Sequence, residues 1–275
     1  MRMRQVEERY ISLLTDFGFK RIFGTAINKD LLICFLNSLF DGKQVVKDVS
    51  YLNPEHVGDV YTDRKAIFDV YCEGENGEKF IVEMQNAYQT YFKDRSLFYS
   101  TFPIREQAAL LNFDMNEEAF EKEKIRHSVQ LCDTATHKVF YDKLELIYVE
   151  IAKFNKSLEE LETLYDKWLY ALKNLYKLTQ RPKELCDKVF DRLFEEAEIA
   201  KFTPQELREY EASKIAYRDI KNSVDTAKRE GIAEGMEKKS HEIAKKMLTK
   251  GMDEATVMEI TGLPAELIQQ LKAEM

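Results

Sequence analysis

Two short apolar segments on either side of a Gly-rich turn constrain this chain more than any other feature. They are AIFDVYC, which starts at Ala66, and KFIVEMQ, which ends at Gln85. Both are rich in β-branched and aromatic residues and are bounded by turn residues, so they are typical of a β-hairpin. Each carries an acid where an apolar residue would be usual, Asp69 in the first segment and Glu83 in the second.

The length of the turn decides on which faces of the hairpin the two acids lie. A two-residue turn at positions 76–77 would pair Val70 with Glu83 and separate the acids, because a slip of one residue reverses every side chain. A three-residue loop over 75–77, with Gly77 in the left-handed conformation, instead pairs Asp69 with Glu83. In that register Ile67 also lies opposite Gln85, and Tyr71 lies opposite Ile81.

We predict the three-residue loop because it makes one face of the hairpin wholly apolar. That face consists of Phe68, Val70, Cys72, Phe80, Val82 and Met84. Asp69, Glu83 and Gln85 then share the other face. Paired residues have Cβ atoms roughly 4.5–5.5 Å apart, so two carboxylates repel there unless a cation or a proton lies between them. The pattern favours a metal site, and a solvated sheet face with polar residues is the alternative.

The hairpin resembles the acidic centre of the PD-(D/E)XK nuclease superfamily, in which an Asp on one strand and a Glu-x-Lys on the next hold Mg²⁺. Gln at position 85 and the segment TDFGFKRIFG at 15–24 are similar to one branch, the recombination-promoting nuclease/putative transposase family of bacteria. The resemblance continues in order through LLICFLNSL at 31–39, RSLFY at 95–99 and KFNKSLEELETLYDKWLYAL at 153–172.

This resemblance implies an α/β (α+β) fold, a restriction-endonuclease-like mixed sheet flanked by helices and followed by an all-helical C-terminal region. It implies a metal-dependent DNA endonuclease, a hydrolase of phosphodiester bonds associated with recombination or mobile elements. Asp69, Glu83 and the Met84 carbonyl would hold Mg²⁺, with Mn²⁺ as the other candidate ion. Between 104 and 113 the chain is shorter than its relatives, which implies a shortened central strand and a weak or inactive copy.

Gln85 departs from the Glu-x-Lys pattern. A lysine supplies positive charge, whereas a neutral amide can orient a nucleophile but supplies no charge. Lys65 lies on the same face of the predicted strand as Asp69 by parity, so it is the candidate for the missing charge and, with Asp69, Glu83 and Gln85, for a catalytic role.

Three further residues have two interpretations or more. Asp16 is a candidate additional metal ligand or a helix N-cap. Lys20 is a candidate DNA contact, as one of several basic residues expected near the cleft. Arg95 is a candidate phosphate contact or a member of a surface ion pair.

Composition limits the function classes. The formal net charge of −8 speaks against a protein that binds DNA tightly and nonspecifically through a basic surface. The four scattered cysteines form no C-x-x-C motif, which predicts buried reduced thiols and disfavours a His/Cys metal site. No apolar run approaches the roughly 18 residues of a membrane span, and the charged N-terminus lacks a signal-peptide core. We therefore expect a soluble cytoplasmic protein without a membrane partner.

We predict three parts: a nuclease-like core at 1–155, a helical extension packing on it at 156–200, and a long helix with a helix-turn-helix-like tail at 201–275. In the tail, Gln269 and Gln270 are the only plausible base readers, so dimerisation or partner binding is favoured over DNA reading. The tail is thus a candidate homo-oligomer surface. The alternative function is a catalytically inactive nuclease-fold scaffold, or a DNA- or protein-binding module acting through the tail.

Overall fold

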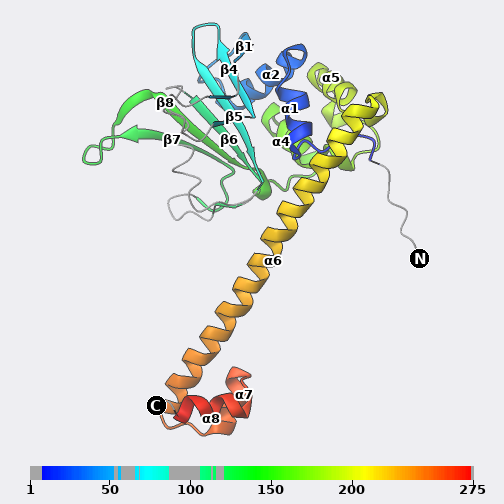
Figure 1. Cartoon of the computed structure of the whole chain (residues 1–275). Helices are drawn as coiled ribbons and strands as arrows, with labels where there is room; N and C mark the ends of the chain where they lie inside the picture. The colour runs from blue at the N-terminus through cyan, green and yellow to red at the C-terminus, as the bar shows by residue number, and fades with distance from the viewer. Residues whose placement is uncertain are drawn as a thin grey trace. The chain divides into compact units, whose positions relative to one another are not determined.

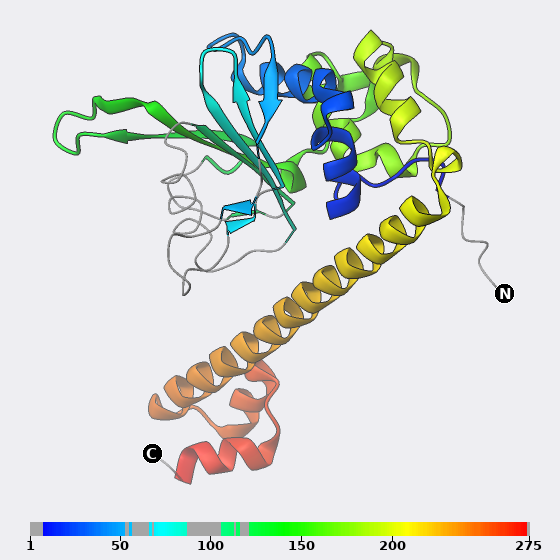
Figure 2. The same cartoon turned by 45° about the horizontal axis from the view of Figure 1, so that its top comes forward.

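A computed structural model describes residues 8–52, 55–56, 66–67, 69–86, 106–112, 114–115 and 121–273. The chain forms two compact units, the first ending at Ile220 and the second starting at Lys221. In the first unit, one face of a twisted sheet is covered by helices, as two views show (Figure 1, Figure 2).

The sheet of the first unit is mixed and has six described strands. Their order across the sheet is β1 (Val49–Tyr51), β4 (Val70–Gly74), β5 (Lys79–Gln85), β6 (Glu106–Leu111), β8 (Val139–Glu150) and β7 (Arg126–Cys132). The central strands β5, β6 and β8 run parallel, and the outer neighbours β4 and β7 pair with them antiparallel. Two short strands, β2 (Glu55–His56) and β3 (Ala66–Ile67), form a separate pair. The mixed sheet with flanking helices confirms the predicted fold class.

The register of the β4–β5 hairpin confirms the three-residue loop. Val70 pairs with Val82 and Glu73 with Lys79, and the Gly74 N–H donates to the Glu78 carbonyl, so residues 75–77 form the loop. Gly77 has a φ of +82°, in the left-handed region that favours glycine.

The first predicted strand of the hairpin is wrong in its extent. The chain bends at Asp69, β4 begins only at Val70, and Ile67 pairs with Glu55 in the separate sheet, not with Gln85. The carboxylate of Asp69 accepts a hydrogen bond from the Met84 N–H, so a side chain takes the place of a backbone acceptor where β4 ends. The parity argument for Lys65 required an unbroken strand, and Lys65 itself lies outside the described residues.

The apolar face of the hairpin packs against helices α1 (Asp16–Phe23), α2 (Lys29–Phe40), α4 (Leu164–Asn174) and α5 (Lys188–Glu196) in one continuous core. Trp168 is fully buried at its centre, with ring centroids 5.7 Å from Phe23 and Phe35 and 5.0 Å from Phe190. Phe19 and Phe23 of the segment TDFGFKRIFG thus belong to one aromatic cluster, with ring centroids 5.1 Å apart. Because this core also includes Tyr210, it does not by itself place boundaries at 155 or 200, and the three-part division stays a prediction.

Other local features follow from the same chain. Strand β8 runs unbroken over 12 residues. The capping box at Ser157 closes only a short 3₁₀ turn, and α4 starts at Leu164 behind a second capping box of Thr163 with Asp166. Cys132 and Cys186 are exposed, so the expectation of buried thiols is wrong for both.

Strand β6 occupies the segment where the resemblance implied shortening. All six of its residues pair with both β5 and β8. A paired central strand is therefore present at this place.

Helix α6 (Pro204–Thr249) begins at the predicted signal, since Thr203 and Glu206 exchange capping hydrogen bonds of 3.2 and 2.8 Å. Gly231 and Gly235 do not interrupt it. Among the described residues, no single helix has the length and apolar composition of a membrane span; the one bent pair that meets the test, 16–23 with 26–40, supplies core residues of the first unit.

The second unit contains the C-terminal part of α6 and two short helices, α7 (Glu254–Thr261) and α8 (Ala265–Ala273). Gly251 and Gly262 have φ values of +79° and +69° and follow the ends of α6 and α7, where the left-handed region favours glycine. The unit has its own small core of Ala244, Val257, Ile268 and Leu271.

Candidate functional site

Asp69 lies at the bend before β4, with its side chain 23% exposed. Its Oδ2 accepts a hydrogen bond of 2.8 Å from the Met84 N–H of β5. The N–H and C=O of one strand residue point to the same side of the strand. The Met84 carbonyl is therefore directed to the same side as its N–H, toward the bend that contains Asp69. The structure thus brings these two candidate ligands together.

Glu83 follows Val82, the partner of Val70 in the hairpin, and is only 7% exposed. Side chains alternate along a strand, so Glu83 and Gln85 share the face opposite Val82 and Met84, which belong to the core. Two acids on one face of the hairpin were predicted. Asp69 precedes the first paired residue of β4, so that arrangement stays a prediction.

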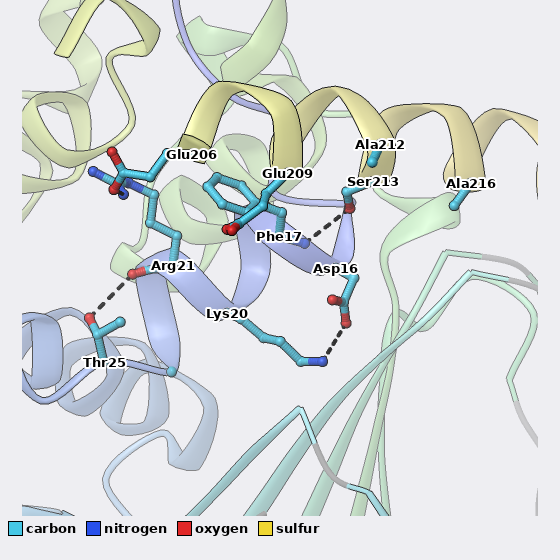
Figure 3. A pocket seen from close by; sticks show the side chains of 11 residues that line it. Asp16, Phe17, Lys20, Arg21, Thr25, Glu206, Glu209, Ala212, Ser213 and Ala216 are labelled. Carbon is cyan, nitrogen blue, oxygen red and sulfur yellow. Dashed lines mark hydrogen bonds and ion pairs between the residues drawn. The ribbon is translucent and has the colours of Figure 1, made fainter. Parts of the chain in front are cut away.

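Lys20 is the cation next to Asp69. Its Nζ lies 2.6 Å from Asp16 Oδ1, four residues earlier on α1, and 3.7 Å from Asp69 Oδ1 (Figure 3 shows the Asp16 contact). Asp16 is not the N-cap of α1, because the Thr15 hydroxyl holds that position and accepts the Gly18 N–H. Sequence reasoning missed the Lys20–Asp69 contact; only the i, i+4 spacing of Asp16 and Lys20 was visible in the sequence.

The electrostatics of this cluster follow from burial. Burial raises the pKa of the Asp69 carboxyl, and the Met84 N–H and the Lys20 ammonium offset this only in part. Burial by itself would lower the pKa of Lys20, but the hydrogen bond and charge of Asp16 and the charge of Asp69 together raise it. Asp69 is thus a partly desolvated carboxylate whose charged form a further cation would stabilise.

The donors of this site fit a hard divalent cation. Two carboxylates and one carbonyl are oxygen ligands, and Mg²⁺ is usually bound through one or two carboxylates while keeping several waters. Within the described ranges, no group of three or more His, Cys, Asp or Glu residues is placed to hold a metal ion. A cation here would therefore rely on Asp69, Glu83, the Met84 carbonyl and water.

A second polar cluster lies on the same face of the sheet, at the carboxyl end of β8. Glu150 is fully buried and lies in one row with Leu111 and Gln85. It contacts His127 Nε2 at 3.0 Å, Lys153 Nζ at 2.9 Å and the Met115 N–H at 2.6 Å. Sequence reasoning missed this cluster, because a single acid at the end of an apolar strand gave no signal.

An open groove of about 810 Å³ separates α1 from the start of α6 (Figure 3). Two contacts join α1 to α6 along this groove. They are the Arg21–Glu206 ion pair and the hydrogen bond of 3.1 Å from the Phe17 N–H to Ser213 Oγ. Asp16 and Lys20 also line it. The groove therefore adjoins the polar cluster that ends at Asp69.

Four candidate residues remain, two in the predicted nuclease-like core and two in the tail. Lys65 and Arg95 lie outside the described residues. In the tail, Gln269 and Gln270 are both exposed on α8, and Gln270 borders a groove with His241 and Lys245 of α6.

A mixed sheet flanked by helices, with an Asp at the start of the hairpin bonded to the strand that carries a Glu-x-Gln, defines a protein of the PD-(D/E)XK nuclease fold. The family described as PD-(D/E)XK nuclease family transposase matches residues 13–227, and this chain belongs to it. A second family model, the C-terminal HTH domain of the Rpn/YhgA-like nuclease family, matches residues 237–273. Both matches confirm the resemblance found in the sequence. Comparisons with curated proteins and with solved structures found no match.

Proposed function

We propose that this chain is a Mg²⁺-dependent DNA endonuclease that hydrolyses phosphodiester bonds during recombination or the movement of mobile elements. The observation that carries the proposal is the hydrogen bond from the Met84 N–H to Asp69, which holds this carboxylate against β5 next to the position of Glu83. Membership of a nuclease family supports the same activity. Mn²⁺ is expected to replace Mg²⁺, because it accepts the same oxygen ligands.

Each residue of the site has a proposed task. Asp69, Glu83 and the Met84 carbonyl hold the cation. Asp16, the additional candidate ligand from the sequence, instead binds the Lys20 ammonium group in the structure. A bound divalent cation would polarise the scissile phosphate and make water a stronger nucleophile. Gln85 orients that water through its amide.

The remaining candidates concern charge and DNA contact. Lys65 stays the sequence-based candidate for positive charge, and Lys20 and Arg95 the candidates for contacts with DNA phosphates.

The test is a cleavage assay of purified protein with Mg²⁺ or Mn²⁺, paired with calorimetric titration of Mn²⁺. Asp69→Ala and Glu83→Ala are each expected to abolish cleavage and to weaken Mn²⁺ binding. Asp48→Ala is the matched control, because Asp48 is an exposed acid that pairs with Lys29 and precedes β1, whose first residue pairs with Gly74 at the turn end of β4. Equal cleavage by the wild type and both site variants would refute the proposal.

A second candidate function is DNA binding by the helical tail without cleavage, as in an inactive scaffold. The match of residues 237–273 to an HTH domain favours it. Replacing both Gln269 and Gln270 by Ala should then reduce retention of DNA by the full chain, and Gln205→Ala, at the start of α6, serves as the control. DNA retention that survives the double substitution would count against base reading by α8.

The homo-oligomer expected from the C-terminal helices is also a proposal. Ile232, Met236 and Ile243 are exposed on α6 and are spaced four and seven residues apart, so they lie on one side of the helix. A second copy of the chain is the proposed partner, because HTH proteins commonly bind two half-sites as dimers. Light scattering of Met236→Glu against wild type tests it. We further propose that the protein works in the cytoplasm and divides at 155/156 and 200/201.

A further inference from the structure

We propose that Lys20, presented by α1, supplies the positive charge that Gln85 does not, and that Asp16 positions it. This inference rests on the proposed nuclease function and assigns a residue of that same site. The positively charged side chain then comes from α1, a helix that precedes the hairpin in the chain.

The first argument is charge. Gln85 is neutral, and Lys20 is the ammonium group whose contact with Asp69 the structure records, at 3.7 Å. That distance is longer than the 2.7–3.2 Å of a direct hydrogen bond. Asp16, at 2.6 Å, is the residue that binds the ammonium closely. The lysine is thus held beside Asp69 without closing its Oδ1 to a cation.

The second argument is access. The side chain of Lys20 is 40% exposed and borders the groove between α1 and α6. A phosphate oxygen that approaches Asp69 from solvent can therefore meet the ammonium group directly. A cation fixed where negative charge develops stabilises a transition state without reorganising first.

The third argument is rigidity. Phe19 and Ile22 of α1 are fully buried, and the Thr15 hydroxyl caps the helix. The Phe17 N–H and the Arg21 side chain tie α1 to Ser213 and Glu206 at the start of α6 (Figure 3). Lys20 therefore extends from a fixed helix. Asp16 restricts the end of its long side chain, which makes Asp16 a positioning residue.

The experiment combines kinetics with calorimetric titration of Mn²⁺ in the absence of DNA. Lys20→Met should lower kcat by about 10²-fold with a smaller effect on KM, as for removal of one preorganised donor. It should raise the affinity for Mn²⁺ severalfold, because a cation that competes beside Asp69 is gone. The double variant Lys20→Met with Gln85→Lys should have a kcat at least tenfold higher than that of Lys20→Met. Lys20→Arg should also retain more activity than Lys20→Met.

Lys29→Met is the matched control, because Lys29 is an exposed lysine of α2 that pairs with Asp48. It should change neither kcat nor the affinity for Mn²⁺. Asp16→Asn should lower kcat without weakening Mn²⁺ binding. Weaker binding, as for Asp69→Ala, would make Asp16 a ligand and overturn its positioning role.

Three outcomes overturn the role of Lys20. If the wild type cleaves DNA and Lys20→Met cleaves it equally well, this inference is refuted and the proposed nuclease function is not. Reduced kcat together with weaker Mn²⁺ binding, or with no recovery by Gln85→Lys, assigns Lys20 a structural role only. A wild type that neither binds Mn²⁺ nor cleaves DNA refutes both proposals. Circular dichroism and thermal unfolding of each variant identify any loss of fold. If Lys20→Met does not fold, the kcat of Lys20→Arg is compared with that of the wild type, and a loss of activity in a folded Lys20→Arg protein supports the role of Lys20 whereas an unchanged kcat shows only that a positive charge is accepted at this position.

Discussion

The backbone N–H of Met84 donates a hydrogen bond of 2.8 Å to the carboxylate of Asp69. This bond ends β4, because a side chain accepts where the next ladder carbonyl would. It also ties one candidate ligand to the strand that carries the other, Glu83. The carboxylate is therefore held in place before any cation arrives, although its burial works against its charge.

The pH dependence of stability should reveal this burial. The pKa of Asp69 is raised in the folded protein above its ordinary value of 3.8, with burial as the main cause. The folded state then binds the proton more tightly than the unfolded state, so Asp69 lowers the free energy of unfolding as pH rises from 3.8 through the raised pKa. Asp69→Asn should remove this slope, measured by urea unfolding at a series of pH values.

Asp48→Asn is the control of opposite sign. The hydrogen bond from Lys29 lowers the pKa of Asp48, which is fully exposed. Its stabilisation is present above its ordinary pKa and is lost as pH falls through the lowered value. Wild-type and Asp69→Asn proteins with the same pH slope would show that burial of Asp69 has no energetic consequence.

Gly77 lies in the loop that sets the register of β4 with β5. Its φ of +82° lies in a region where a side chain costs about 1–2 kcal/mol. Gly77→Ala should therefore lower the free energy of unfolding by about that amount, and it should weaken Mn²⁺ binding if the loop changes length. Asn76→Ala is the comparison, because position 76 needs no left-handed backbone. Equal stability of the two variants would contradict the role of Gly77.

The sequence predicted the parts of the fold that local chemistry decides. The loop length of the hairpin follows from Gly77 and from the alternation of apolar residues, and the start of α6 follows from the Thr203–Glu206 capping pair. The break at Asp69 could not be predicted, because it depends on a hydrogen bond to Met84 on another strand. Likewise α4 starts behind the second of two capping boxes, and the sequence alone does not choose between them.

The candidate site was predictable only in part, for the same reason. Asp69 and Glu83 belong to one hairpin, so the loop length was enough to predict that Asp69 comes next to β5, where it accepts a hydrogen bond from the Met84 N–H. Lys20 comes from a helix that is distant in the chain, and its approach to Asp69 is set by packing of α1 on the core. Lys65 was favoured because parity reaches only residues of the same strand. The contacts of Glu150 with His127 and Lys153 also arise from neighbouring elements.

Trp168 should carry much of the stability of the first unit. It is fully buried among Phe23, Phe35 and Phe190. Trp168→Ala should cost about 3–5 kcal/mol in the free energy of unfolding, because it leaves a cavity that the core fills only partly. Phe140→Ala removes an aromatic ring that is 82% exposed on β8 and should change stability by less than about 0.5 kcal/mol. Similar losses in chemical denaturation would contradict the assigned core.

Gly231 and Gly235 distinguish a free helix from one built for close contact with a second copy. A Cβ added at either position meets no atom of the chain within 4 Å in the described structure. Ala should therefore stabilise α6 by about 1 kcal/mol per site, because glycine is a poor helix former. Hydrogen exchange at amides 225–240 measures this gain, and light scattering of the same Gly231→Ala/Gly235→Ala protein measures assembly. If copies pack backbone to backbone along this stretch, the added methyl groups should weaken the oligomer even as exchange slows. Slower exchange with unchanged assembly would exclude these glycines from the interface, and faster exchange would mean that α6 is bent there in solution.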